Sequence, residues 1–386
     1  MARSAWHGFG LVFPALALNY LGQGALLVVN SRAIDNPFYL LYPSWALYPM
    51  VALATAATVI ASQATKSGAY SLTRQAIQLG FLPRMNVVQT SAKAIGQIYL
   101  PVVTWTLFVA VLAAVLGFGS SSRLASAYGV AVTGTMLTTT FLTFFVIRYG
   151  WGYNLVLSVF ATAFFMAVDA AFLSSSLLKV AEGGWFPLVV GFGMFVLMLT
   201  WLQGRKVLLE RLQTSDVRLR PFLESLFLAP PLRVPGTAIF LTATPDVVPH
   251  ALVHNLNHNG VLHERVLFLT VAMKEVPFLS LDECAHIEPL GHDCYRITLS
   301  FGFMDRPDIP QALGSCPAES GLELDLMKTS FFVSRETIIP VASIPSGMAP
   351  WRERLFAAMS RNAGSPAEYF NIPPNRVIEI GTQIQI

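Results

Sequence analysis

The sequence has 386 residues, of which 54% are hydrophobic and only 12% are charged, and its mean hydropathy is +0.56. Soluble domains carry roughly 25% charged residues, so this composition excludes a wholly soluble globular protein. The formal net charge of +3 is too small to favour nucleic acid as a partner.

The charged residues are divided unevenly along the chain. Residues 1–203 hold nine Lys and Arg and three acids, which are Asp35, Asp169 and Glu182. Residues 204–386 hold the other 16 basic and 19 acidic residues. The sequence therefore predicts a transmembrane bundle over 1–203 and a C-terminal domain over 204–386.

Six apolar segments in the first region are long enough to cross a bilayer, which takes ~20 residues of helix. We place them at residues 5–29, 44–65, 98–118, 124–147, 153–175 and 185–203. A signal peptide is the alternative for the first segment. Its apolar run continues past the usual length of a signal peptide core, and more spans follow, so we favour a span.

The loops between these segments differ in basic residues, and cytoplasmic loops carry more of them. One set of loops is rich in them (Lys66, Arg74, Arg84, Lys93, Arg148, Arg205, Lys206, Arg211) and the other is poor (Arg32, Arg123, Lys179). The start of the first span and the C-terminal domain are therefore expected in the cytoplasm. In the loop 68–96, Ser71 is expected to cap a short helix that Gly80 ends.

The C-terminal region alternates strand and helix patterns. Residues 206–226 are expected to form a helix that Pro221 breaks or kinks. Strands are expected at 236–242, 265–272, 295–303, 329–333 and 375–386, and helices at 248–259, from 310 and at 351–361. This order predicts a small α/β domain with a mixed sheet.

Few residues suggest a metal site or an enzyme. The cysteines Cys284, Cys294 and Cys316 are odd in number, which fits a reducing compartment. His250, His254 and His258 share one helical face, which can bind zinc, but no HExxH motif or cysteine pair completes such a site. The chain also has no Gly-rich phosphate loop or nucleophile elbow, so neither an enzyme nor an ATP-driven pump is expected.

The segment 120–148 is apolar enough to span a bilayer yet carries Tyr128, Thr133 and a run of threonines, with Gly129 and Gly134 among them. Small residues and hydroxyls can pack helices closely in lipid, or they can line a polar path. Both interpretations stay open for each hydroxyl.

Two further polar residues lie inside predicted spans. Asp169 is the only acid well inside one, and it either has a functional role or lies near the outer interface and caps a turn or bonds a serine. Gln23 stands between Gly22 and Gly24, where packing or a hydrogen bond between helices is the first interpretation.

Several long segments resemble the Kup potassium-uptake family. In the spanning region these are LNYLGQGALL, NPFYLLYPSWALYP, SLTRQAIQLGFLPRM, AYGVAVTGTM and EGGWFPL, and in the C-terminal region VPGTAIFLT, HNLNHNGVLHERV and IPPNRVIEIGTQIQI. The resemblance covers nearly the whole chain. It implies the last six of about twelve spans, and the family's Gly-Asp-x-Gly-Thr-Ser-Pro motif is absent here. We therefore expect an N-terminally truncated form, either a fragment of a longer gene with Met1 as an internal start or one half of a split gene.

The resemblance also implies a function. It predicts a partial LeuT-like bundle in the inner membrane, with K⁺:H⁺ symport and no cofactor beyond the transported ions. It makes Tyr128, Thr133, Asp169 and Gln23 the candidate residues of the ion path. A homodimer through the C-terminal domain is a further expectation. The alternatives are a membrane-anchored regulatory or binding module, and a non-functional gene fragment.

Overall fold

The computed structural model describes residues 8–85, 88–89, 98–214, 217–274, 276–280, 285–305, 307–314, 325–339 and 347–385. The chain divides into two compact units, Met1–Ala69 and Tyr70–Ile386, and each is described by itself.

The first unit is helical. After the π-helical turn η1 (Gly8–Val12) come α2 (Phe13–Val29), the 3₁₀ turn η2 (Ser31–Asp35), the short helix α3 (Pro37–Leu40) and the first part of α4 (Leu47–Gln78). The side chain of Asn30 accepts a hydrogen bond from the backbone of Arg32 and so caps η2. Helix α2 thus ends where a capped turn begins.

Helix α4 differs from its predicted form. It continues through Ser71 to Gln78, so the expectation of a separate short helix capped by Ser71 is wrong. Outside hydrocarbon, polar residues propagate a helix well, and nothing in this segment stops it. Gly80 follows with φ = +80°, a conformation that favours glycine, and ends the helix as predicted.

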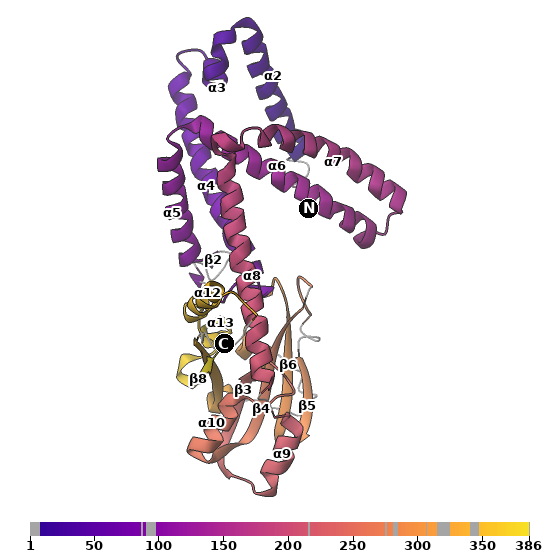
Figure 1. The fold of residues 1–386 in the computed structure, drawn as a ribbon, viewed down its shortest axis with the longest axis vertical. Coiled ribbons are helices and arrows are strands. Elements are labelled where there is room, and N and C mark those ends of the chain that lie inside the picture. The colour runs from indigo at the N-terminus through magenta and orange to yellow at the C-terminus, as the bar shows by residue number, and fades with distance from the viewer. Residues whose placement is uncertain are drawn as a thin grey trace. The chain divides into compact units, whose positions relative to one another are not determined.

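The second unit contains four more spanning helices (Figure 1). They are α5 (Pro101–Phe118), α6 (Ser121–Phe145) with the π-turn η3 (Val146–Gly150), α7 (Leu155–Leu177), and α8 (Trp185–Thr214) after the π-turn η4 (Val180–Gly184). Pro101 lies in the first turn of α5, where its missing N–H costs nothing. Within the described residues, six helices are long and apolar enough to cross a membrane, as the sequence predicts.

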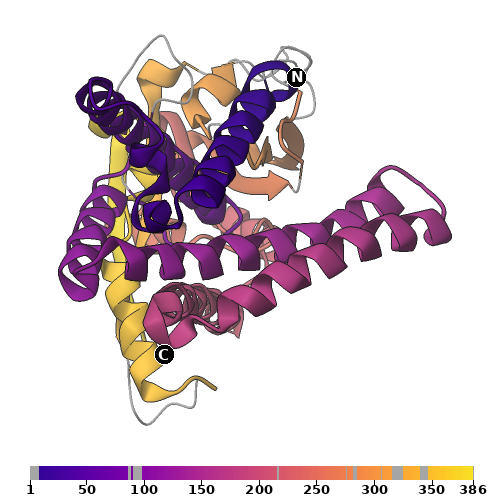
Figure 2. The same ribbon diagram turned by 90° about the horizontal axis from the view of Figure 1, so that it is seen from above.

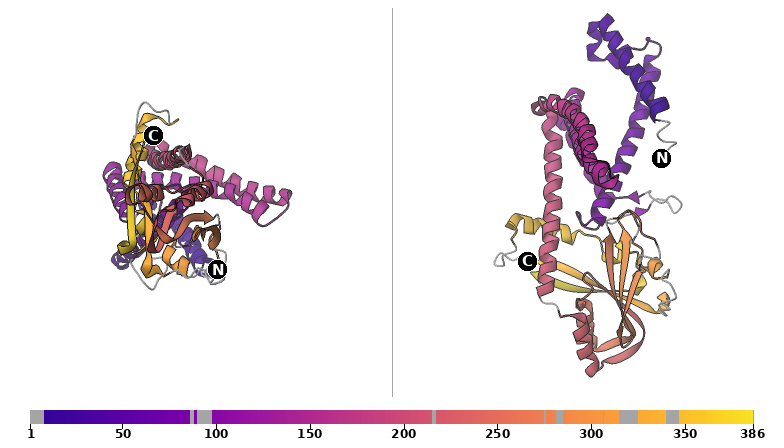
Figure 3. Two further views of the ribbon diagram at one scale, coloured as in Figure 1. Left: turned by 90° about the horizontal axis from the view of Figure 1, so that it is seen from below. Right: turned by 90° about the vertical axis from the view of Figure 1, so that its right-hand side faces the viewer.

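Helix α8 does not end with its apolar part. Figure 3 shows it running as one rod from the spanning helices to the side of the sheet. It ends at Thr214, and a separate helix α9 (Leu219–Leu228) follows, with Pro221 in its first turn. The helix predicted over 206–226 is broken, as expected, but the break precedes Leu219 and is not at Pro221, because a proline is well tolerated near the start of the new helix.

A six-stranded sheet follows, in the order β5-β6-β4-β3-β7-β8. Its strands are β3 (Leu232–Thr242), β4 (Val261–Lys274), β5 (Ala285–Gly291), β6 (Cys294–Gly302), β7 (Thr329–Ile339) and β8 (Val377–Gln385). All neighbouring pairs are parallel except β5 with β6. The predicted mixed sheet of an α/β domain is confirmed, and β5 is the strand that the sequence did not reveal.

The sheet is covered on both faces. On one face α9 and α10 (His250–Asn259) pack on Phe240, Phe268 and their neighbours. On the other, α11 (Ile309–Gly314) and α13 (Pro366–Tyr369) pack on Leu267, Ile297 and Phe331. Alternate strand residues thus serve opposite cores, as the period of a strand requires.

The described residues also form four short elements. These are β1 (Val88–Gln89), which pairs with β2 (Ile98–Tyr99), and the 3₁₀ turns η7 (Leu326–Lys328) and η8 (Pro374–Arg376). One longer helix, α12 (Pro350–Arg361), packs against α8 and β7.

Candidate functional site in the α6–α7 hairpin

Helices α6 and α7 lie side by side as an antiparallel hairpin (Figure 2). The side chains that α7 buries are polar: Ser158, Thr162 and Asp169. Its large apolar side chains, such as Val156 and Phe160, are exposed. The hairpin is therefore polar where the helices meet and apolar where it faces hydrocarbon, which is the order that lipid favours.

Asp169 lies at the centre of this interface and is only 6% exposed. The hydroxyl of Thr140 on α6 donates a hydrogen bond of 2.5 Å to its Oδ2. No Lys, Arg or His in the described part of the chain forms an ion pair with it. A hydrogen bond to a carboxylate is among the stronger ones, and it fixes one carboxylate oxygen on the partner helix. The partner is thus a threonine of a neighbouring helix, where the sequence suggested a cap or a serine.

Thr140 is the residue of this site that the sequence analysis did not single out. It belongs to the threonine run 138–140, and the hydroxyl of Thr138 in the same run bonds elsewhere. Thr138 donates instead to the carbonyl oxygen of Gly134 in its own helix. Only the register of the hairpin decides which threonine meets the carboxylate.

Thr162 extends the polar face. It lies seven residues, or about two helical turns, before Asp169 on α7. Its hydroxyl is buried and has no hydrogen-bond partner in the described residues, whereas Ser158 donates to the carbonyl oxygen of Asn154. The interface therefore holds one carboxylate and one unused hydroxyl on the same side of α7.

Tyr128 and Thr133, the two candidates on α6, do not converge. Thr133 donates to the backbone carbonyl of Gly129 at 2.8 Å and lies about two turns before Thr140 on the same face. Tyr128 is 71% exposed. They are five positions apart, which places them about 140° apart around the helix.

Gln23, the fourth candidate, belongs to the first unit. Its Nε2 donates to Oδ1 of Asn19, one turn earlier in α2, at 3.2 Å. Among the described residues this is a bond within one helix, so the expected bond between helices is not present there.

The second unit also joins its spanning helices to the α/β domain. Arg352 of α12 donates to Thr200 Oγ1 at 3.0 Å and to Gln203 Oε1 at 2.8 Å, both on α8. Phe356 packs on Trp201 at 5.3 Å between ring centroids and fills the space beside Gly204, where a side chain would collide with its ring. Helix α8 is thus part of the core of the domain.

The last turns of α4 and the segment that follows it contact the same domain. Arg74 donates to the carbonyl oxygens of Met304 and Asp305, and Gln78 donates to that of Asp305 at 2.7 Å. The guanidinium of Arg84 lies over the rings of Tyr369 and Phe370, and burial, with Arg205 nearby, lowers the pKa of Arg84. These contacts therefore hold the end of α4 and Arg84 against the domain.

No zinc site takes shape in the part of the chain that the structure describes. No group of three His, Cys, Asp or Glu side chains comes together there. His254 and His258 stack with ring centroids 5.7 Å apart, along the helical face that the sequence predicts. Cys294 is buried, and burial raises the pKa of its thiol to about 11, while Cys284 and Cys316 lie outside the described residues.

Two family models match the chain. Residues 2–206 match the K⁺ potassium transporter integral membrane domain, and residues 235–386 match the K⁺ potassium transporter C-terminal domain.

Several curated proteins are similar along the whole chain. The chain is 77% identical over 384 residues to the probable potassium transport system protein Kup 2 of Cupriavidus necator. It is 58% identical over 384 residues to the probable Kup protein of Nitrosospira multiformis and 56% to that of Herminiimonas arsenicoxydans. Each match covers 100% of this chain and 60 or 61% of the relative, so the chain spans about three fifths of their length.

Proposed function

The chain belongs to the Kup family of potassium transporters, and we propose that it contributes the α6–α7 hairpin and the α/β domain to a carrier that moves K⁺ across the cytoplasmic membrane. The observation that carries this proposal is the Asp169–Thr140 contact inside a spanning hairpin. Burying a carboxylate among apolar helices costs free energy, and a carboxylate found there usually has a function.

The transport is K⁺:H⁺ symport in this proposal. A carboxylate with one oxygen held by a threonine still has a free oxygen that can take up a proton or face a cation. Potassium must exchange its waters for several oxygens at once. Thr140, Thr133 and Asp169 supply only part of such a shell, so the ion site also takes oxygens from other segments of the carrier.

The carrier is LeuT-like in this proposal, with its site between two structural repeats. The α/β domain lies in the cytoplasm, which the excess of basic residues in the loops on that side supports. A second copy binds through this domain. The outer edge of β8 supports that step, because no described strand pairs with it and an open edge can pair with another chain.

The test is the growth of a bacterium that lacks potassium uptake, on limiting potassium. The chain is expressed alone, and together with the part of the Cupriavidus necator relative that it does not match. We expect the pair to restore growth and the chain alone not to. Growth with the chain alone would overturn the need for oxygens from other segments.

The site is tested in the pair. Asp169→Asn should abolish growth on limiting potassium, and Thr140→Val should weaken it. Thr138→Val is the matched control, because its hydroxyl bonds only its own helix and should leave growth unchanged. If neither the pair nor any variant supports uptake although the chains are in the membrane, an anchored binding module becomes the better account.

A further inference from the structure

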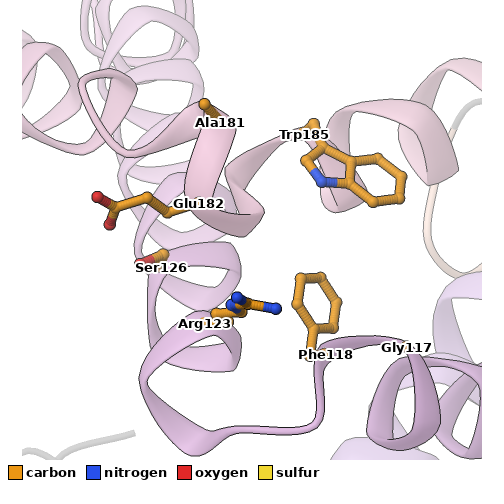
Figure 4. Close-up of a pocket in the computed structure, with 7 residues that line it drawn as sticks. All are labelled: Gly117, Phe118, Arg123, Ser126, Ala181, Glu182 and Trp185. Carbon is orange, nitrogen blue, oxygen red and sulfur yellow. The ribbon is translucent and has the colours of Figure 1, made fainter.

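A hollow of about 530 Å³ lies where the corner between α5 and α6 meets the turn between η4 and α8. Figure 4 shows the side chains around it. Phe118, Arg123 and Ser126 come from the corner, and Glu182 and Trp185 come from the turn. It is distinct from the Asp169 interface.

Close backbone contacts fix the shape of this hollow. Gly183 has φ = +150°, and a Cβ there would lie 2.6 Å from the carbonyl oxygen of Arg123. A Cβ on Gly184 would lie 2.6 Å from a methyl group of Val130. The rings of Phe118 and Trp185 lie 6.3 Å apart and form a wall. Two adjacent glycines therefore hold the turn against the corner, and no larger residue fits there.

Two opposite charges line the hollow without meeting. The side chains of Arg123 and Glu182 form no ion pair or hydrogen bond with any described residue. Figure 4 shows why they do not pair with each other: the guanidinium points toward Phe118, and the carboxylate points away from it. An exposed ion pair stabilises a protein little, so nothing strongly favours pairing of these two side chains. Because they are not paired, Arg123 can bind an anionic group and Glu182 a cationic group of the same ligand.

The hollow lies at a membrane surface. Trp185 begins α8, and Trp201, Val207 and Leu208 farther along α8 pack in the core of the α/β domain, so the hollow is at the far end of this spanning helix. Trp185 is about half exposed, as tryptophans in the interfacial belt are. A ligand here meets lipid on one side and water on the other.

We propose that this hollow binds the zwitterionic head group of a phospholipid, of the phosphoethanolamine type. Arg123 offers the planar set of N–H donors that suits a phosphate. Glu182, whose carboxylate points outward from the turn (Figure 4), receives the ammonium group. The acyl chains of such a lipid lie along the apolar sides of α5 and α8, which a soluble zwitterion could not use. The proposal does not depend on the transported ion.

Native mass spectrometry of the whole chain tests this proposal. The purified protein is mixed with equal amounts of phosphatidylethanolamine and phosphatidylglycerol that have the same acyl chains. We expect phosphatidylethanolamine to be the preferred adduct. Arg123→Gln and Glu182→Gln should each lower its occupancy about fivefold, since each removes one charge-assisted contact to the head group. Lys179→Gln, in the same turn but outside the hollow, should change nothing.

Both variants replace exposed side chains, and an unchanged melting temperature verifies their folding. Equal binding of the two lipids, or occupancy that neither substitution lowers, would overturn the proposal. A preference for phosphatidylglycerol that only Arg123→Gln removes would overturn the zwitterionic part and leave a plain anion site. Displacement of the lipid by inorganic phosphate or by free phosphoethanolamine would show that acyl chains are not needed, and would overturn the choice of a lipid.

Discussion

The spanning hairpin and the α/β domain bury opposite kinds of side chain. Helix α7 buries Ser158, Thr162 and Asp169, whereas the sheet buries Phe240 and Phe268. The difference follows from the two solvents. Water drives apolar groups into the sheet, while hydrocarbon is as apolar as leucine and gives helices no such reason to associate. Buried side chains therefore form the hydrophobic core in the α/β domain, whereas in the hairpin they form the candidate site.

Helix α8 belongs to both regions and changes character along its length. In its first part Leu188, Val189 and Phe192 are exposed, as lipid-facing residues are. In its last part Trp201, Val207 and Leu208 are buried with Phe356. One helix thus passes from a lipid-facing surface to a water-excluded core without a break.

The largest expected effect comes from the core of the sheet. Phe240→Ala should lower the free energy of unfolding by roughly 3–5 kcal/mol, because it leaves a cavity between α10 and the sheet. Leu116→Ala, at a side chain that is 81% exposed on α5, should change it by less than about 0.5 kcal/mol. Denaturant melts of the chain in detergent measure both. Similar losses would remove the contrast between the two regions.

A smaller effect is expected where the regions join. Arg352→Ala removes the bonds to Thr200 and Gln203 and should cost about 1–2 kcal/mol. Arg354→Ala, two residues along α12 and exposed, is the control and should be neutral. The same melts measure both variants. Equal melting temperatures for the two would mean that α12 does not hold α8.

The smallest effect concerns pH. Burial lowers the pKa of His263 on β4 below its ordinary value of 6.5, so the unfolded chain binds more protons as the pH falls. The contribution of His263 to stability is therefore present above pH 6.5 and is lost as the pH falls below it. His263→Gln should reduce the loss of stability between about pH 8 and pH 5.5, the range around an ordinary histidine pKa. An unchanged slope in the His263 variant would contradict this account.

The pattern of apolar residues along the sequence predicted much of the fold but little of the candidate site. The six spans and most strands follow from runs and alternation, and Gly80 and Pro101 mark helix ends by their backbone preferences. Strand β5 escaped because Pro289 interrupts its pattern; an antiparallel edge strand tolerates that residue.

The site itself depends on contacts that local sequence does not encode. Asp169 stands out as a lone acid in a span, but its partner is set by the register of two helices. Nothing in the threonine run distinguishes Thr140 from Thr138. The contact of Arg352 with Thr200 on α8 could not be predicted for the same reason, since these two residues are far apart in the sequence.

The most direct test of the central claim is a double-mutant cycle on the hairpin. Asp169→Asn, Thr140→Val and the double variant are melted in detergent, with Thr138→Val as the control partner. The account predicts a coupling energy of about 0.5–2 kcal/mol between Asp169 and Thr140, the range of hydrogen bonds between spanning helices and to charged groups. It predicts none between Asp169 and Thr138. Equal coupling to both threonines, or none to either, would contradict the claim that a polar contact at Asp169 holds this hairpin together.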